Sequence, residues 1–143
     1  MKDDTSSKKP RVLVVCTHNS ARSQMAEAIL RHRYGDRLEA LSAGTEPGSV
    51  HPLAMQVMAE AGMPLDGQRS KSVAEVLQTG PVDLVLTVCD SARETCPFVP
   101  SRRGTIHRAF EDPSAALEAE RLAAFRRVRD ELDRWLAAIA GNL

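Results

Sequence analysis

Apolar runs alternate along the chain with segments of helical periodicity. Four runs have the length and apolar character of strands: residues 11–16, 38–44, 83–89 and, more weakly, 104–110. Four segments have helical spacing, with proline near a start or glycine at an end: residues 20–34, 51–62, 72–80 and 122–139. The last of these carries Phe125 and Trp135 on its apolar face, so both aromatic side chains are expected in the core.

Strands that alternate with helices at these spacings predict an α/β fold. We expect a three-layer sandwich, with a four-stranded parallel sheet covered by helices on both faces. Residues 11–143 form one predicted domain, and the polar residues 1–10 form a flexible tail. Ligands of such sheets bind beyond the carboxyl ends of the strands. Cys16 and Cys89 end two predicted strands, so both thiols are expected at that edge.

Composition excludes several classes of function. Lys+Arg and Asp+Glu both number 19, and aromatic residues make up 3%, so neither a basic surface nor a stacking platform for nucleic acid is present. No apolar run is long enough to span a membrane, and the polar amino terminus is not a signal peptide, so we expect a cytoplasmic protein. Three cysteines are too few, and odd in number, for a secreted disulfide scaffold.

The chemistry is concentrated where the first strand turns into the first helix, in residues 16–22, here called the cysteine loop. Backbone amides at such a turn lack helical partners, and Arg22 can grip two oxygens of a tetrahedral anion. The same surroundings stabilise a thiolate at Cys16, to which Ser23 can donate. The predicted oxyanion-binding residues are Thr17, His18, Asn19, Ser20, Ala21, Arg22 and Ser23.

For two residues of this set, Asn19 and His18, the sequence also predicts the conformation. Asn19 tolerates left-handed backbone geometry in a loop without glycine, and the His18 side chain is expected to face solvent. The alternative reading makes Cys16 a small apolar residue and Arg22 a surface charge. The strand-to-helix setting favours the functional reading.

Four segments carry a family resemblance. The stretches VCTHNSARSQMAEAIL, LSAGT, DLVLTVCDSARETCP and FEDPSAA resemble the thioredoxin-coupled arsenate reductases, which share the low-molecular-weight protein tyrosine phosphatase fold. The resemblance extends from Arg11 to the last helix. It implies arsenate as substrate, with phosphate or sulfate as mimics, and thioredoxin as the reductant. No cofactor is implied, and we expect a monomer.

The resemblance also implies catalytic roles. Cys16 attacks arsenate, Cys89 attacks the resulting adduct to form a Cys16–Cys89 disulfide, and Cys96 takes over in a Cys89–Cys96 disulfide. Reduction of As(V) to As(III) needs two electrons, which two thiols supply. Asp112 matches the general acid, and Pro113 biases it toward extended geometry. A resolving pair seven residues apart resembles the thioredoxin-coupled branch more than reductases that use glutaredoxin or mycothiol.

Two alternatives remain beside this reading. A low-molecular-weight tyrosine phosphatase would use the same loop, but such phosphatases carry a tyrosine after Asp-Pro, where this chain has Ser114, and Cys89 and Cys96 would be idle. A non-catalytic thiol redox or oxyanion sensor would use the disulfide as a signal. Turnover of arsenate with a reductant discriminates among the three.

A monovalent-cation region is the last feature that the resemblance implies. Some of these reductases bind potassium beside the loop, and Asn19, Glu27 and Ser42 match three of its ligands, whereas Lys71 stands where an aspartate is expected. A lysine ammonium in place of the ion would balance the charge of Glu27. The alternative is a Lys71 that points to solvent. The spacing of Cys89 and Cys96 is not that of a zinc site, so no metal is expected.

Overall fold

The computed structural model describes residues 9–90 and 98–143 of the chain. Most of the predicted tail, residues 1–8, lies outside the described residues, as does Cys96. At the end of that tail, Pro10 O accepts a hydrogen bond from Glu39 N (2.9 Å), so the chain is already part of the fold there.

A parallel sheet of four strands confirms the predicted α/β class. The strands are β1 (Arg11–Cys16), β2 (Glu39–Gly44), β3 (Leu84–Thr87) and β4 (Thr105–His107). Their order in the sheet is β2-β1-β3-β4, and every neighbouring pair is parallel. The helices are α1 (Arg22–Tyr34), α2 (Pro52–Glu60), α3 (Val73–Gln78), the 3-10 turn η2 (Pro113–Ala115) and α4 (Glu118–Ala140).

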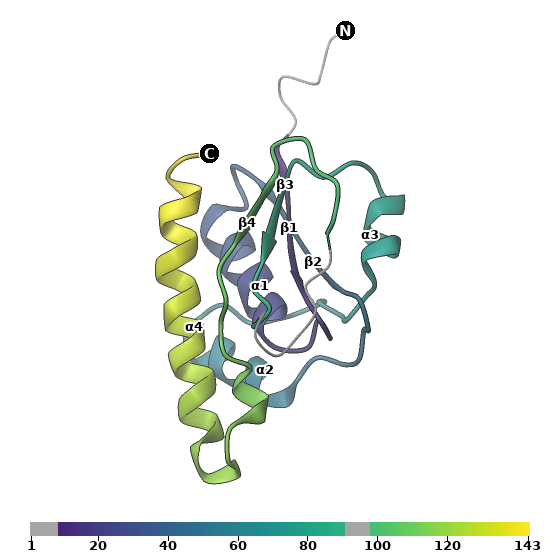
Figure 1. The fold of residues 1–143 in the computed structure, drawn as a ribbon. Helices are drawn as coiled ribbons and strands as arrows, with labels where there is room; N and C mark the ends of the chain where they lie inside the picture. The colour runs from purple at the N-terminus through teal and green to yellow at the C-terminus, as the bar shows by residue number, and fades with distance from the viewer. Residues whose placement is uncertain (1–8, 91–97) are drawn as a thin grey trace, which may run out of the picture.

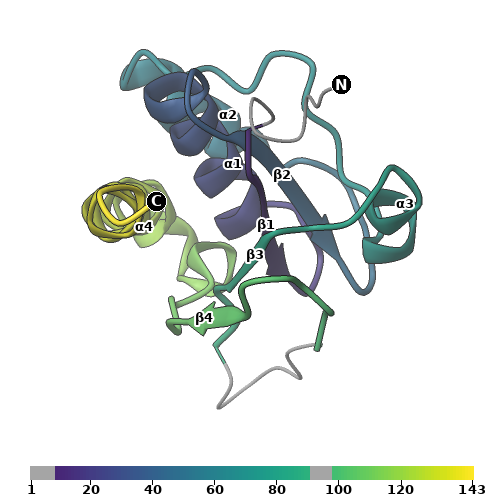
Figure 2. The same ribbon diagram turned by 90° about the horizontal axis from the view of Figure 1, so that it is seen from above.

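Helices cover the sheet unequally on its two faces. Helices α1, α2 and α4 lie on one face and α3 on the other (Figures 1 and 2). Along β1, Val12 and Val14 join the large apolar cluster beneath α1 and α4, whereas Leu13 and Val15 join a smaller cluster beneath α3. This alternation is what a strand buried on both faces requires.

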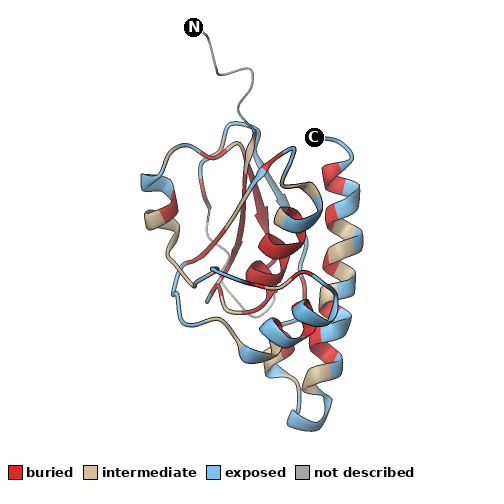
Figure 3. Cartoon of the chain, turned by 180° about the vertical axis from the view of Figure 1, so that it is seen from behind, coloured by how far each residue is buried: buried red, intermediate tan, exposed pale blue. Residues whose placement is uncertain are grey.

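Helix α1 lies in the middle of the larger layer. Residues 22–30 are all buried, so this helix has no solvent-facing stripe in its first half. Figure 3 shows the contrast with α4, where buried and exposed residues alternate along the helix. Polar side chains in the first turns of α1 are therefore enclosed by protein, and each needs a hydrogen-bond partner.

Several predicted boundaries are corrected by the structure, among them the end of the fourth strand, which stops at His107 and not at Phe110. Helix α1 begins at Arg22 and not at Ser20, because the preceding residues are used by the cysteine loop. Helix α4 begins at Glu118, about one turn before the predicted Leu122, where acidic residues in the first turn complement the helix dipole. Strand β3 ends at Thr87, so Cys89 lies two residues beyond it.

The carboxyl ends of β1 and β2 meet at Cys16 and Gly44, which are paired in register. A Cβ atom added at Gly44 would lie 2.5 Å from Thr17 O, so only glycine lets the cysteine loop pass this close to β2. Within the described parts of the chain, no helix has both the length and the apolar character needed to cross a membrane.

Candidate active site

The carbonyl groups of residues 17–20 all point out of the cysteine loop. Their hydrogen-bond donors are Glu46 N to Thr17 O (2.9 Å), Gly48 N to His18 O (3.1 Å), Gln24 Nε2 to Asn19 O (3.1 Å) and His51 N to Ser20 O (2.9 Å). A trans peptide places its N–H opposite its C=O, and the described chain contains no cis peptide. The amides of residues 18–21 therefore turn into the loop, where they form a cradle for an anion.

Asn19 gives the loop its sharp turn. Its φ of 51° is left-handed, as predicted, and its side chain is fully buried. The side chain accepts a hydrogen bond from Lys71 N at Oδ1 (3.0 Å) and donates from Nδ2 to Ser23 Oγ (2.8 Å). The turn is thus fixed by long-range contacts as well as by local preference.

The amino terminus of α1 completes the cradle. Ala21 occupies the N-cap position, where it supplies no side-chain acceptor, and the first turn contains no acidic residue. The positive end of the helix dipole and its first amides are therefore not neutralised by α1 itself. Together with the loop amides, they favour a negatively charged group at this end of the sheet.

Cys16 lies at the base of the cradle and is 2% exposed. Its Sγ is 2.9 Å from Ser23 Oγ, which is the contact predicted from the sequence. A hydroxyl that donates to sulfur stabilises the thiolate, as do the surrounding amides. The site therefore has the surroundings that a cysteine nucleophile needs.

Arg22 joins the cysteine loop to residues 110–116, here called the acid loop. The guanidinium is almost fully buried; Nη1 donates to Phe110 O (3.1 Å), and Nη2 lies 3.9 Å from Asp112 Oδ2. The side chain of Asp112 is 35% exposed, and its Oδ1 accepts from Ser114 N (3.0 Å) and Ser114 Oγ (2.7 Å). Glu111 instead pairs with Arg127 at the surface (2.7 Å), so it is not the carboxylate of the site.

The second cysteine reaches the same edge of the sheet from β3. Cys89 is fully buried, and its Sγ lies 3.9 Å from Val15 O, next to Cys16 in sequence. The expectation that both thiols lie at this edge is therefore confirmed. Cys96 lies outside the described residues, so the structure does not test its place in a relay.

The remaining members of the predicted loop set differ in burial. His18 is exposed, as predicted, and its Nδ1 lies 3.1 Å from Glu46 O. Thr17 and Ser20 are half-buried, and Ala21 is buried. In residues 9–90 and 98–143, no three His, Cys, Asp or Glu side chains are grouped so that they could hold a metal ion.

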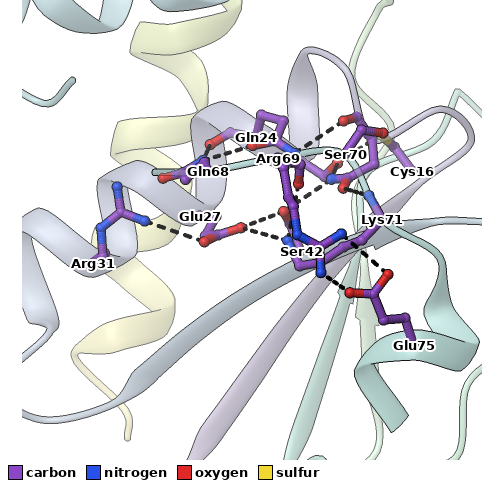
Figure 4. Close-up of polar contacts among 12 residues, drawn as sticks. Cys16, Gln24, Glu27, Arg31, Ser42, Gln68, Arg69, Ser70, Lys71 and Glu75 are labelled. Atoms are coloured by element: carbon purple, nitrogen blue, oxygen red, sulfur yellow. Dashed lines mark hydrogen bonds and ion pairs between the residues drawn. The ribbon is translucent and has the colours of Figure 1, made fainter. Parts of the chain in front are cut away.

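The residues of the predicted cation region come together beside the loop (Figure 4). Ser42 Oγ donates to Glu27 Oε1 (2.5 Å), and Asn19 Nδ2 donates to Ser42 Oγ (3.0 Å). Lys71 Nζ lies 3.6 Å from Glu27 Oε1, with the two side chains 14% and 10% exposed. The Lys71 ammonium therefore lies beside Glu27, as the cation hypothesis requires, and its role in place of an ion stays a prediction.

Sequence reasoning missed two amides that support the cysteine loop. Gln24 is fully buried, and its Nε2 bridges Asn19 O and Arg69 O (3.1 and 2.9 Å). Gln68 Nε2 in turn donates to Gln24 Oε1 (2.8 Å). Periodicity gave no signal for Gln24, because α1 is buried on all sides over this stretch.

His51 is a third residue that the sequence did not single out. It caps the amino terminus of α2, where its Nδ1 accepts from Leu53 N (3.0 Å), and its ring lies against Phe125. Burial lowers the pKa of His51, the charge of Arg121 lowers it further, and Asp112 acts in the opposite direction. His51 is therefore electrostatically linked to the acid loop as well as hydrogen-bonded to the cysteine loop.

Proteins that resemble this chain in sequence and in structure include several arsenate reductases. An arsenate reductase of Halalkalibacterium halodurans is 39% identical over 135 residues, which covers 92% of this chain and 96% of that protein. A solved arsenate reductase in a phosphate-binding state superposes with a TM-score of 0.78 at 28% identity, over 93% of this chain and 98% of that one.

A thioredoxin-dependent arsenate reductase of Corynebacterium glutamicum superposes with a TM-score of 0.70 at 26% identity, over 97% of this chain and 66% of that one. The sequence profile described as low molecular weight phosphotyrosine protein phosphatase matches residues 11–143. The resemblance predicted from the sequence motifs is confirmed, and the chain belongs to the low molecular weight phosphotyrosine protein phosphatase family.

Proposed function

We propose that this protein reduces arsenate to arsenite, with Cys16 as the nucleophile. The observation that carries the proposal is the cradle of inward-turned amides around a buried thiol, closed by Arg22. A tetrahedral oxyanion fits such a cradle, and arsenate is the oxyanion named for relatives that match nearly the whole chain.

The first step uses the cysteine loop and the acid loop together. The Cys16 thiolate attacks arsenic, an S–As bond forms and one As–O bond breaks. Asp112 gives a proton to the departing oxygen, which leaves as water. Arg22 contacts the acid loop at Asp112, so the group that grips the anion also holds the proton donor near it.

The second step transfers the two electrons. Deprotonated Cys89 attacks Cys16 Sγ, and the electron pair of the S–As bond moves to arsenic. The products are arsenite, with arsenic as As(III), and a Cys16–Cys89 disulfide. The burial of Cys89 beside the end of β1 supports this role, because it lies at the same sheet edge as the nucleophile.

Regeneration completes the cycle. The Cys96 thiolate attacks Cys89, releases Cys16 as a thiolate and leaves a Cys89–Cys96 disulfide, which thioredoxin reduces with its two thiols. Cys89 is fully buried beside β1, so passing the disulfide outward requires a change of conformation around Cys89. The thioredoxin-dependent relative supports this choice of reductant.

One coupled assay tests the proposal. Arsenate, thioredoxin, thioredoxin reductase and NADPH are combined with the protein, and NADPH oxidation is followed. We expect oxidation that depends on both arsenate and thioredoxin. Hydrolysis of an aryl phosphate is measured in parallel, since the same cradle supports a weak phosphatase activity. Rapid hydrolysis without arsenate-dependent oxidation would assign the chain to the phosphatase branch instead.

A further inference from the structure

A buried chain of hydrogen bonds connects an ion pair beside the cysteine loop with the thiol of Cys16. It runs from Glu27 through Ser42, Asn19 and Ser23 to Cys16, with links of 2.5, 3.0, 2.8 and 2.9 Å. Figure 4 shows the part of this arrangement around Glu27, Ser42 and Lys71. Apart from Lys71, every side chain of the arrangement is buried, and Lys71 is 14% exposed.

Lys71 fixes the orientation of the amide in the middle of the chain. Its backbone N–H can only donate, so the Asn19 atom 3.0 Å away is the acceptor Oδ1. The two protons of Asn19 Nδ2 must then point to Ser23 and Ser42. Asn19 cannot rotate its amide by 180° without placing two donors against each other.

That orientation leaves the protons of both serines available for the other hydrogen bonds of the chain. Both hydroxyl oxygens accept from Asn19, so each serine has its own proton left to donate. Ser42 gives its proton to the carboxylate of Glu27, which can only accept when charged. Ser23 Oγ lies 2.9 Å from Cys16 Sγ, and when Cys16 is a thiolate its sulfur carries no proton, so Ser23 is then the donor of that bond. The free proton of Ser23 is thus placed where a thiolate needs a donor.

The charge of Glu27 keeps this arrangement of donors in place, and cations balance it on both oxygens. Arg31 Nη1 lies 3.2 Å from Oε2 and is 36% exposed, whereas Lys71 Nζ lies 3.6 Å from Oε1 and is 14% exposed. Lys71 Nζ also donates to Arg69 O (3.2 Å), which helps to fix the ammonium beside Glu27. The less exposed cation is screened less by water and faces the oxygen that Ser42 contacts.

We infer that Lys71 is a positioning residue for Cys16, whose ammonium acts as a tethered monovalent cation and holds the Glu27–Ser42–Asn19–Ser23 chain in the order that stabilises the thiolate. The inference rests on the proposed function only in taking Cys16 as the nucleophile. The Lys71 ammonium contacts neither the thiol nor the loop amides; it acts through Glu27, while the Lys71 backbone N–H holds the Asn19 side chain. The other charged groups of the site, Arg22 and Asp112, are not changed by a substitution at Lys71.

The pH profile of Cys16 alkylation tests this role without any substrate. In a Cys89→Ser, Cys96→Ser background, Cys16 is the remaining thiol, and its rate of reaction with iodoacetamide reports the thiolate fraction. Lys71→Gln removes the ammonium and keeps the backbone N–H to Asn19. We expect its profile to move to higher pH, with alkylation at pH 6.5 slower by about three- to tenfold, the worth of roughly one hydrogen bond.

Arg69→Gln is the matched control. Arg69 lies two residues away and is also a cation, but its side chain pairs with Glu75 at the surface and not with Glu27. Its profile should overlay that of the parent. The inference fails if Lys71→Gln overlays the parent, or if both substitutions move the profile equally. Absence of arsenate turnover with an unchanged alkylation pattern would instead overturn the proposed function alone.

A second measurement compares the unmodified protein with one variant, and its first half does not depend on how a variant folds. Thermal unfolding is compared in potassium and sodium chloride at equal ionic strength. With the ammonium in the cation position, we expect the same Tm in both salts. Lys71→Asp places a second carboxylate beside Glu27 and should create a rise in Tm specific to potassium. A potassium-specific rise in the unmodified protein, or none in Lys71→Asp, would overturn the inference.

Discussion

The cysteine loop and the acid loop face the same anion site but are held in different ways. In the cysteine loop, Asn19 and Arg22 are at most 3% exposed, and the carbonyl groups of residues 17–20 accept hydrogen bonds from outside the loop. In the acid loop, the Asp112 side chain is 35% exposed, and its Oδ2 lies 3.9 Å from Arg22 Nη2. The proposed anion grip is thus held rigidly by protein contacts, whereas the proposed proton donor lies where water and small movements can adjust it.

Removing the nucleophile is the most severe test of the proposed grip. Cys16→Ser should abolish arsenate reduction and any phosphatase activity, because both begin with the same thiolate. Arg22→Lys should be nearly as harmful, since an ammonium cannot reproduce the planar fork that also holds Phe110 O. The coupled assay measures both variants. Substantial reduction by Cys16→Ser would refute the mechanism.

Substitutions of Cys89 and Cys96 should stop the proposed reaction at two different steps. Cys89→Ser should stop at the arsenic adduct of Cys16, because no thiol at the sheet edge can attack it. Cys96→Ser should complete one reduction and then stall with a Cys16–Cys89 disulfide. Single-turnover arsenite release, read with mass spectrometry of the protein, distinguishes the two. Sustained thioredoxin-dependent turnover by both variants would contradict the relay.

A substitution in the acid loop should slow the reaction without abolishing it. Asp112→Asn removes the proton and keeps the shape, so adduct formation should slow by about 10²- to 10⁴-fold, the usual effect of losing a positioned acid. Glu111→Gln is the matched control, because that carboxylate pairs with Arg127 at the surface. Rates of adduct formation are compared across pH. An Asp112→Asn rate equal to the parent at every pH would remove Asp112 from the mechanism.

The smallest expected effect lies where the two loops meet, at His51. Its pKa is lowered mainly by burial, so the unfolded chain binds a proton at His51 more readily than the folded chain does. Unfolding therefore takes up a proton as pH falls through the ordinary histidine range, near 6.5, and stability is lost there and retained above it. His51→Asn keeps an acceptor for Leu53 N and removes the titration.

Urea unfolding at pH 7.5 and pH 5.5 measures this effect. The variant should lose less stability between the two pH values than the parent does. The same substitution at exposed His32 controls for the loss of an imidazole elsewhere. An unchanged pH dependence in His51→Asn would show that other groups carry the acid sensitivity.

Local sequence predicted the first half of the site well. The β-branched run before Cys16, the absence of glycine in the loop and the choice of Asn19 led to the correct strand, turn and left-handed residue. These features are encoded within a few residues, by side-chain shape and backbone preference.

The long-range half was not predictable in the same way. Gln24 meets Arg69 O, and Lys71 meets Glu27, across separations of 45 and 44 residues. Hydrophobic periodicity indicates which residues are buried, but it does not indicate which distant polar groups form hydrogen bonds with each other. Lys71 was expected near Glu27 only because of the family resemblance, and Gln24 was missed altogether.

The wide separation of these partners affects when the protein becomes chemically competent. The hydrogen bond from Lys71 N to Asn19 spans 52 residues, and that from Arg22 to Phe110 spans 88. Contacts of this range form only as tertiary structure is completed, because the intervening chain must first be ordered. A nascent or partly folded chain therefore lacks the contacts that hold Asn19 and Arg22 beside Cys16. The surroundings of the proposed nucleophile are completed only at the end of folding.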